Sequence, residues 1–325
     1  MSKKPEIQKA SIFTISYICE ELYGLKLALS ENEIEKILSS ICSCIGEDQT
    51  NENIKVTGLK AFQFSHSYFS GVMQKDDIRT FVMDLIVKCT IRPNNSEDIA
   101  MLAWECLTDI SAALYDYLAN YLPVISKLST DLINSATENE TCIIPAIEFW
   151  NSIAQEEASR QQSGSCQKRC QSQNSAENAR PNRDYISGYK TGLLQAILLS
   201  LRKVQDDDFG SNNLSVFSSA HKCLLSLFEV LGDNSIDLTT QFITAFIGNQ
   251  SWQDKCATLT AFNCLLQGIS HGRANELFSK SYTNIVEMLS SDNFYVKMSA
   301  AQLLHVSTKF CKTYLIDGGG LTMNC

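Results

Sequence analysis

Residues 252–268 read WQDKCATLTAFNCLLQG, a helical stretch in which the bulky apolar residue Phe262 follows the small residue Ala257. A similar pattern recurs about every 40 residues, and a period of about 40 to 47 residues made of two helices is typical of HEAT or armadillo repeats. The bulky positions are Phe62, Leu107, Phe149, Leu225, Phe262 and Leu304, and the small residues that precede them include Gly58, Ala103, Ala146, Ala257 and Ala300. Because one helix pair cannot bury its apolar face alone, pairs stack upon each other. The sequence therefore predicts an all-α HEAT/armadillo-type α-α superhelix, or solenoid.

The spacing of this pattern also predicts how the chain is organised. The bulky positions are separated by 45, 42, 76, 37 and 42 residues, and the long interval contains a polar insertion. We expect one solenoid over residues 1–325, with about six helix pairs after a leading half-repeat. Residues 160–182 are rich in Gln, Ser and Asn, and such low hydrophobicity cannot offset the entropy of ordering, so a flexible polar loop is expected there. The glycine-rich residues 317–325 are expected to form an irregular tail.

The expected helices follow from apolar periodicity and from breakers such as Pro93. They cover residues 5–22, 31–45, 53–69, 75–89, 96–117, 118–135, 139–160, 185–204, 214–231, 238–248, 252–268, 275–289 and 294–314. Asn139 is expected to cap the seventh of these helices, and Pro145 is expected to bend it.

Composition narrows the classes of function. The chain has 44% hydrophobic residues and a net charge of −9, which disfavours binding to nucleic-acid phosphates and favours basic partners. No apolar run is long enough to cross a membrane, so neither a signal peptide nor membrane insertion is expected. A net negative charge of this size also keeps a protein soluble, so the charge alone does not distinguish a surface that binds basic partners from one that is only solvated.

Cysteine and histidine give no pattern typical of a reactive site. Most of the 13 cysteines fall in helical apolar patterns, where a free thiol acts as a small hydrophobe. Only Cys166 and Cys170 lie together in a polar segment, and no second Cys or His pair follows at zinc-site spacing. Because no phosphate loop, catalytic triad or HExxH pair is present either, we expect no catalytic residues, metal, cofactor or enzymatic activity.

Several stretches, in order along about 310 residues, resemble one family. They are Tyr17-Ile18-Cys19-Glu20-Glu21, Ile147-Glu148-Phe149-Trp150-Asn151-Ser152-Ile153 with Glu156-Glu157, Tyr189 with Gly192 and Leu194-Gln195, the acidic run at Asp206, and Trp252 with Ala261-Phe262-Asn263-Cys264-Leu265-Leu266-Gln267-Gly268. In these residues the chain resembles the importin beta (karyopherin-beta) nuclear transport receptors, from about their fourth to their tenth HEAT repeat. The members of that family are much longer, so the repeats with which they first grip Ran lie outside the resemblance.

The resemblance implies a nucleoporin site. In importin beta, phenylalanine-glycine repeats insert between the outer helices of adjacent repeats, and the matching positions here are Leu38, Ser39, Cys42, Ile78, Phe81 and Val82. Leu38 and Cys42 lie four residues apart, as do Ile78 and Val82, so each set shares one face of its helix. An apolar cleft for a Phe ring is therefore expected, with weak and rapidly exchanging binding. The alternative is that these residues only form the apolar seam between two repeats.

The resemblance also implies an acidic partner-binding loop at Asp206, Asp207 and Asp208, corresponding to the family's longer acidic loop that meets Ran and the basic cargo adaptor. Three neighbouring carboxylates attract Lys and Arg clusters in a salt-sensitive way, although most acidic turns are only solvated. Members of the family use tryptophans to stack against the Arg and Lys side chains of the adaptor. One of these tryptophan positions corresponds here to Leu214 or Phe209, and another to Gln302, and the loss of these tryptophans weakens the expectation of adaptor binding. The tryptophans that remain, Trp104, Trp150 and Trp252, are expected to pack in the core.

The functional hypothesis is a non-enzymatic nuclear transport receptor of importin-beta type, or a fragment of one, acting in protein import. Its expected partners are phenylalanine-glycine nucleoporins, a basic cargo or import adaptor, and Ran through a partial site, with no nucleic acid. Its expected locations are the cytoplasm and the nucleus, between which it would shuttle at the nuclear pore. The alternative is a HEAT-repeat scaffold or adaptor subunit outside nuclear transport.

Overall fold

The computed structural model describes residues 4–91, 95–135, 140–169, 181–209 and 214–311, and within them every regular element is a helix. The α-helices are α1 (Pro5–Gly24), α2 (Glu31–Ile45), α3 (Glu52–Val72), α4 (Asp76–Cys89), α5 (Glu97–Ser111), α6 (Leu122–Asn134), α7 (Glu140–Arg169), α8 (Tyr185–Ser200), α9 (Val216–Leu231), α10 (Ile236–Phe246), α11 (Trp252–Gly268), α12 (His271–Met288) and α13 (Phe294–Phe310). Short 3-10 helices join some of them: η1 (Tyr115–Asn120), η3 (Leu201–Lys203), η4 (Asp206–Phe209) and η5 (Gly232–Ser235). The all-α prediction is confirmed for these residues.

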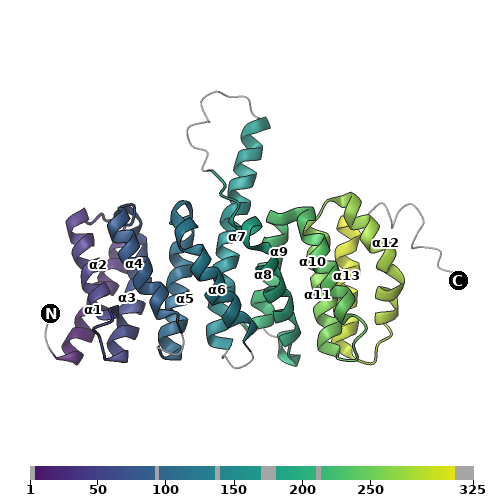
Figure 1. Ribbon diagram of the computed structural model, residues 1–325, viewed down its shortest axis with the longest axis horizontal. Coiled ribbons are helices and arrows are strands. Elements are labelled where there is room, and N and C mark those ends of the chain that lie inside the picture. Colours follow the sequence, from purple (N-terminus) through teal and green to yellow (C-terminus); the bar gives the residue numbers. More distant parts are fainter. Residues whose placement is uncertain (1–3, 92–94, 136–139, 170–180, 210–213, 312–325) are drawn as a thin grey trace. The chain divides into compact units, whose positions relative to one another are not determined.

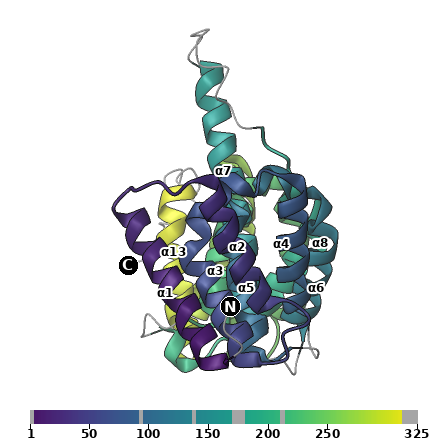
Figure 2. The same cartoon turned by 90° about the vertical axis from the view of Figure 1, so that its left-hand side faces the viewer.

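The chain divides into two compact units, and each is described by itself. The first contains residues 1–132 and 137–152, hence α1 to α5, nearly all of α6 and the first part of α7. In it α3 packs against α1, α2 and α5, while α4 packs against α2 and α5. Helices α1, α3 and α5 thus form one layer, and α2 and α4 form a second layer against it (Figures 1 and 2).

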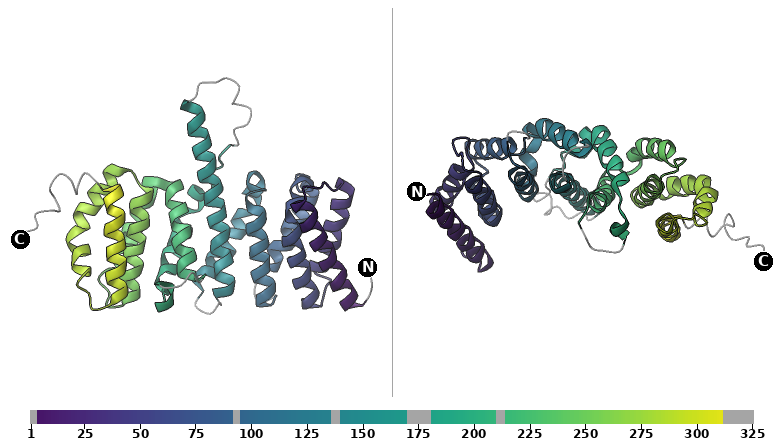
Figure 3. Two further views of the ribbon diagram at one scale, coloured as in Figure 1. Left: turned by 180° about the vertical axis from the view of Figure 1, so that it is seen from behind. Right: turned by 90° about the horizontal axis from the view of Figure 1, so that it is seen from below.

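The second unit contains residues 133–136 and 153–325, hence the rest of α7 and α8 to α13. Here α11 packs between α9 and α13, and α8, α10 and α12 pack against α9, α11 and α13 respectively. In Figure 3 the yellow α13 and the green α11 run side by side. Both units therefore show the same packing arrangement, in which an inner helix is covered by the helix that precedes it in the chain.

The repeat positions read from the sequence coincide with the core in four of six cases. Phe62, Leu107 and Phe149 are fully buried, and Phe262 nearly so. Leu225 and Leu304 are only half-buried, and their neighbours Leu224 and Leu303 are the fully buried residues. The repeat pattern read from the sequence is therefore wrong by one residue in α9 and α13, because the sequence does not reveal which of two adjacent leucines faces the core.

The expected polar loop at residues 160–182 is wrong for its first ten residues. Helix α7 continues to Arg169, and Figure 1 shows it extending beyond the ends of the neighbouring α8 and α9. Buried Arg160 holds this part of the helix: its Nε donates to Glu156 Oε1 at 2.7 Å, and its Nη1 donates to the carbonyl oxygen of Pro181 at 2.9 Å. Helical hydrogen bonds are local, so a polar segment can stay helical when side chains anchor its base. Residues 170–180, the expected tail at 317–325 and the expected cap Asn139 lie outside the described residues.

The cysteines in the described part of the chain behave as core residues. Ten of them are buried free thiols, including Cys42 and Cys106. Burial raises the pKa of eight of these thiols, in the case of Cys89 to about 11, so these eight are protonated near neutral pH. The side chains of Cys166 and Cys170 lie outside the described residues.

Candidate functional site

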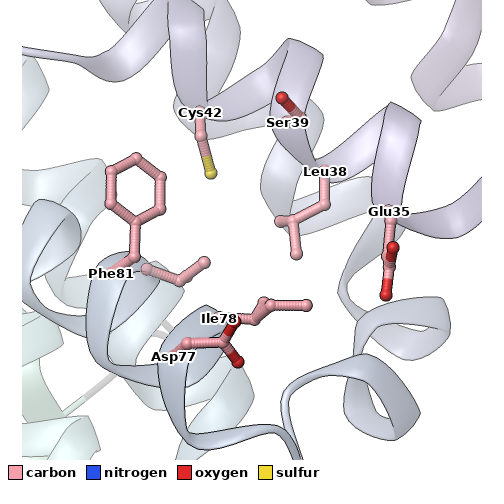
Figure 4. A pocket seen from close by; sticks show the side chains of 8 residues that line it. Glu35, Leu38, Ser39, Cys42, Asp77, Ile78 and Phe81 are labelled. Carbon is pink, nitrogen blue, oxygen red and sulfur yellow. The ribbon is translucent and has the colours of Figure 1, made fainter.

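All six residues of the expected nucleoporin site line a single cleft between α2 and α4. The cleft has a volume of about 350 Å³, and its lining consists of Leu38, Ser39, Cys42, Ile78, Phe81 and Val82 together with Glu35 and Asp77. In Figure 4 the side chains of Leu38 and Ile78 face each other across it, with the Phe81 ring on one side and Glu35 on the other. The structure thus brings together every residue of this set, and it adds two carboxylates that the family match did not indicate.

Helix α2 is placed by its first turn and by a close approach to α3. The Ser30 backbone N–H donates to Glu33 Oε2 at 2.9 Å, which is the return half of a capping box and starts the helix at Glu31. Farther along, α2 rests on Gly58 of α3. A Cβ atom at Gly58 would lie 2.9 Å from Ile45 Cγ1, so only glycine allows this approach of the two helices. Leu38 and Cys42 are thereby directed towards α4.

Helix α4 is placed by a buried arginine in its first turn. The Arg79 guanidinium donates to the carbonyl oxygens of Met73 and Gln74, at 3.2 and 3.0 Å, and it forms an ion pair with Asp76. These bonds satisfy carbonyl groups at the end of α3, where the helix itself offers no partner. The same guanidinium lies 4.0 Å from the centre of the Tyr117 ring, a cation–π distance. With its start fixed in this way, α4 presents Ile78 and Phe81 to the cleft.

The residues that line the cleft differ in how much of each side chain is buried by packing between the helices. Leu38, Cys42 and Val82 are 1 to 3% exposed and form the floor, as the seam interpretation requires. Phe81, in contrast, is 60% exposed, and Ile78 is only half-buried. Burial also raises the pKa of the Cys42 thiol to about 12, so at neutral pH it contributes an uncharged, apolar surface. The seam alone therefore accounts for the floor of the cleft but not for the Phe81 ring.

The acidic turn forms η4 in the second unit, and its three carboxylates are not equivalent. Asp208 belongs to the local structure: its Oδ2 accepts from the Gln205 backbone N–H at 2.7 Å, and its Oδ1 accepts from the hydroxyl of Ser215, the residue that caps α9. Asp206 and Asp207 are exposed. Asp208 is therefore the carboxylate that holds this turn together.

An aromatic group that sequence reasoning missed lies directly beside this turn. The Phe209 ring stacks on Tyr295 with 4.9 Å between ring centres, and Tyr295 lies 5.2 Å from Trp252. Phe294, next to Tyr295, is 68% exposed. These four residues, here called the aromatic patch, come from η4 and from the first residues of α11 and α13. The sequence signals were the adjacent pair Phe294-Tyr295 at a helix start and Phe209, one of the two candidates for a family tryptophan position. Neither revealed the group, because it forms across elements almost 90 residues apart.

The tryptophan expectations are met for two residues and corrected for the third. Trp104 and Trp150 are buried, and Trp150 Nε1 donates to Ser129 Oγ at 2.9 Å. Trp252 is half-exposed in the aromatic patch rather than packed in the core, because it stands at the first position of α11, where its ring contacts Tyr295. Of the residues matched to the lost tryptophan positions, Leu214 and Gln302 are exposed, and Phe209, the alternative to Leu214, is half-buried in the aromatic patch.

Other kinds of site find little support in the described part of the chain. No group of three or more His, Cys, Asp or Glu side chains lies close enough there to hold a metal ion. None of its helices has the length and apolar character needed to cross a membrane.

Comparison with known proteins bears on the family resemblance and on the fold. The chain is 22% identical over 313 residues to importin subunit beta-1 of Arabidopsis thaliana and 23% identical over 305 residues to that of Schizosaccharomyces pombe, and it covers 34% of each. These matches include 93 and 94% of this chain. The resemblance to importin beta is confirmed. It concerns a partial stretch, since the chain spans about a third of the length of the curated relatives it matches. No protein-family model matches the chain.

Solved importin-beta structures show the same fold. The TM-score is 0.86 to a Kap95:Nup1 complex and 0.84 both to yeast importin-beta (Kap95p) and to Kap95p bound to RanGDP. Sequence identity is 17 to 18%, and the matches cover 96 to 98% of this chain but only 35 to 36% of the other. The importin-beta-like HEAT solenoid predicted from the sequence is thus confirmed as the fold.

Proposed function

We propose that this chain is an importin-beta-like nuclear transport receptor, or part of one, and that it binds phenylalanine-glycine repeats of nucleoporins in the cleft between α2 and α4. The observation that carries the proposal is the cleft itself, because all six residues at the family's nucleoporin positions line it. The exposed Phe81 ring and half-buried Ile78 offer an incoming Phe side chain apolar contact that the seam does not use. One relative of the same fold is in complex with Nup1.

The chemistry of the cleft suits transient capture. The side chains on its floor are apolar, and the Cys42 thiol among them is protonated at neutral pH, so no reactive nucleophile lines the cleft. An occupant is therefore held by contact and is not chemically converted. Because Phe81 is exposed and the carboxylates of Glu35 and Asp77 line the same cleft, a bound ring stays close to water, which favours fast dissociation. This behaviour fits a receptor that moves between cytoplasm and nucleus through many short contacts. A non-enzymatic role in protein import is the function we propose.

We infer a second, basic partner for the acidic turn. Asp206 and Asp207 supply negative charge, and the aromatic patch beside them supplies ring faces on which Arg and Lys stems stack. This patch offers stacking surfaces near the place where Leu214, or Phe209, corresponds to the family's tryptophan. A basic cargo or adaptor segment is therefore the partner we propose here, with a partial Ran contact through the same turn.

The first experiment measures binding of a fluorescently labelled peptide with several Phe-Gly repeats in neutral Gly/Ser spacers. Fluorescence anisotropy should show saturable binding, weak and rapidly reversible, that a peptide with every Phe replaced by Ser lacks. A HEAT scaffold outside nuclear transport would bind neither peptide. Absence of binding, or equal binding of both peptides, would refute the nucleoporin function.

A second prediction concerns the acidic turn. Replacing Asp206 and Asp207 by Asn should slow association with an Arg/Lys-rich peptide by roughly three- to tenfold at low salt, because exposed charges mainly steer encounters. Asp208 is left unchanged, since it caps the turn. The matched control is Asp237→Asn with Glu287→Gln, two exposed acids on α10 and α12 of the same unit. Stopped-flow fluorescence at low salt and at 500 mM salt, where charges act over about 4 Å, would decide the matter. An association rate unchanged by the substitutions and by salt contradicts the assignment.

A further inference from the structure

A second hollow continues the cleft on the other side of the Phe81 ring. It has a volume of about 530 Å³ and shares Ser39, Cys42 and Phe81 with the first. Its other lining residues are Ser43, Gly46, Glu47, Asp48, Asp84, Leu85 and Lys88. Because the two hollows share residues, they form one groove along α2 and α4, and Phe81 stands in its middle.

The groove is apolar in its middle and acidic at both ends. On α4, Asp77 and Asp84 lie four residues before and three residues after Phe81, so all three share one helix face. On the α2 side, Glu35 precedes the apolar Leu38 and Cys42, while Glu47 and Asp48 follow the helix end. Among the charged side chains that line the two hollows, five are carboxylates and one is an ammonium group.

The nearby cations pair with only two of these five carboxylates, Glu47 and Glu35. Lys88 Nζ is paired with Glu47 at 2.7 Å. Lys75 Nζ lies 2.5 Å from Glu31 and 2.6 Å from Glu35, and its hydrogen bonds to Glu31 and Glu35 raise its pKa. Asp48 and Asp77 form no ion pair with any described residue, and both are exposed, as is Asp84. A ligand in the groove therefore meets a net negative potential on each side of its apolar part.

We propose that this groove selects Phe-Gly segments in which Lys or Arg residues stand on both sides of the Phe, and disfavours segments with acidic flanks. The inference deepens the nucleoporin function proposed above and rests on it. Along α4 the distance from Asp77 to Asp84 is seven helical steps, or about 10 Å at about 1.5 Å per residue. An extended peptide covers that distance in about three residues at about 3.3 Å each. Basic side chains one or two positions from the Phe therefore reach the carboxylates, and their stems pass the exposed face of Phe81.

The test compares three labelled peptides with the same Phe-Gly core and with Lys, Ser or Glu at the flanking positions. With the unaltered chain at low salt, the Lys-flanked peptide should bind roughly five- to tenfold more tightly than the Glu-flanked one, as two exposed ion pairs imply. The Ser-flanked peptide should fall between them. At 500 mM salt the three affinities should converge, because exposed charges are then screened.

Two variants locate the effect. Asp77→Asn with Asp84→Asn should reduce the Lys-to-Glu preference to roughly twofold, whereas Asp98→Asn with Asp131→Asn should leave it unchanged. The control pair matches in kind: Asp98, like Asp77, is an exposed acid in the first turn of its helix, and Asp131, like Asp84, is exposed within a helix.

The outcomes separate this inference from the function on which it rests. If the three peptides bind equally well, or if Asp77→Asn with Asp84→Asn keeps the full preference, the charge selection is overturned while nucleoporin binding stands. If none of the three peptides binds, the proposed function is overturned and the selection with it.

Discussion

Replacing Phe81 by Ala should weaken Phe-Gly peptide binding by about 30-fold, the effect of losing a binding hot spot of about 2 kcal/mol. The free energy of unfolding should change by no more than about 0.5 kcal/mol, because the side chain is 60% exposed and surface substitutions are usually small in effect. Anisotropy titration measures the first quantity, and chemical denaturation followed by circular dichroism measures the second. Loss of binding without loss of stability is the signature of a contact residue.

The controls for this prediction use residues that differ in one property each. Phe294→Ala removes an even more exposed ring, on α13, and should leave Phe-Gly binding unchanged. Leu38→Ala removes a side chain that is 3% exposed, so it should cost about 2 to 5 kcal/mol of stability and confound any binding result. Unchanged binding by Phe81→Ala would rule out the α2–α4 cleft as the nucleoporin site.

Gly268→Ala should destabilise the second unit by about 3 kcal/mol, at the upper end of what overpacking costs. Gly268 ends α11 where it touches α9, and a Cβ atom there would lie 2.5 Å from Phe228 Cβ and 2.7 Å from the Phe228 carbonyl carbon and oxygen. Backbone atoms cannot rotate away, so the two helices must separate. Denaturant unfolding monitored by circular dichroism gives the shift in midpoint.

Gly188→Ala provides the matched control in the same unit. Gly188 lies inside α8, and a Cβ atom added there would have no neighbouring atom within 4 Å, so alanine meets no obstacle. Alanine favours the helix over glycine by about 0.8 to 1 kcal/mol, so this variant should be as stable as the unaltered chain or more stable. A Gly268→Ala chain that unfolds at the same denaturant concentration as the unaltered chain would mean that α9 and α11 do not approach closely.

Sequence alone was sufficient where local signals are strong. The bounds expected for α2 and α11 are those observed, because each helix starts just after a serine N-cap and ends where apolar periodicity stops. At Ser251 this is visible directly: its Oγ accepts from the Asp254 backbone N–H at 3.3 Å. Helix class and repeat period follow from such nearest-neighbour signals, and the family match then named six of the eight residues that line the cleft.

Tertiary structure decided what depends on contacts between distant residues. It extended α7, because Arg160 binds the Pro181 carbonyl and Gln162 binds Glu229 across a gap of 67 residues. It left Phe81 exposed while burying Leu38, although both belong to the same apolar set. It used Asp208 to build a turn and joined Phe209, Trp252 and Tyr295 into one patch. Helical periodicity tells which residues share a face, but the packing of other helices decides whether that face is covered or remains available to a partner.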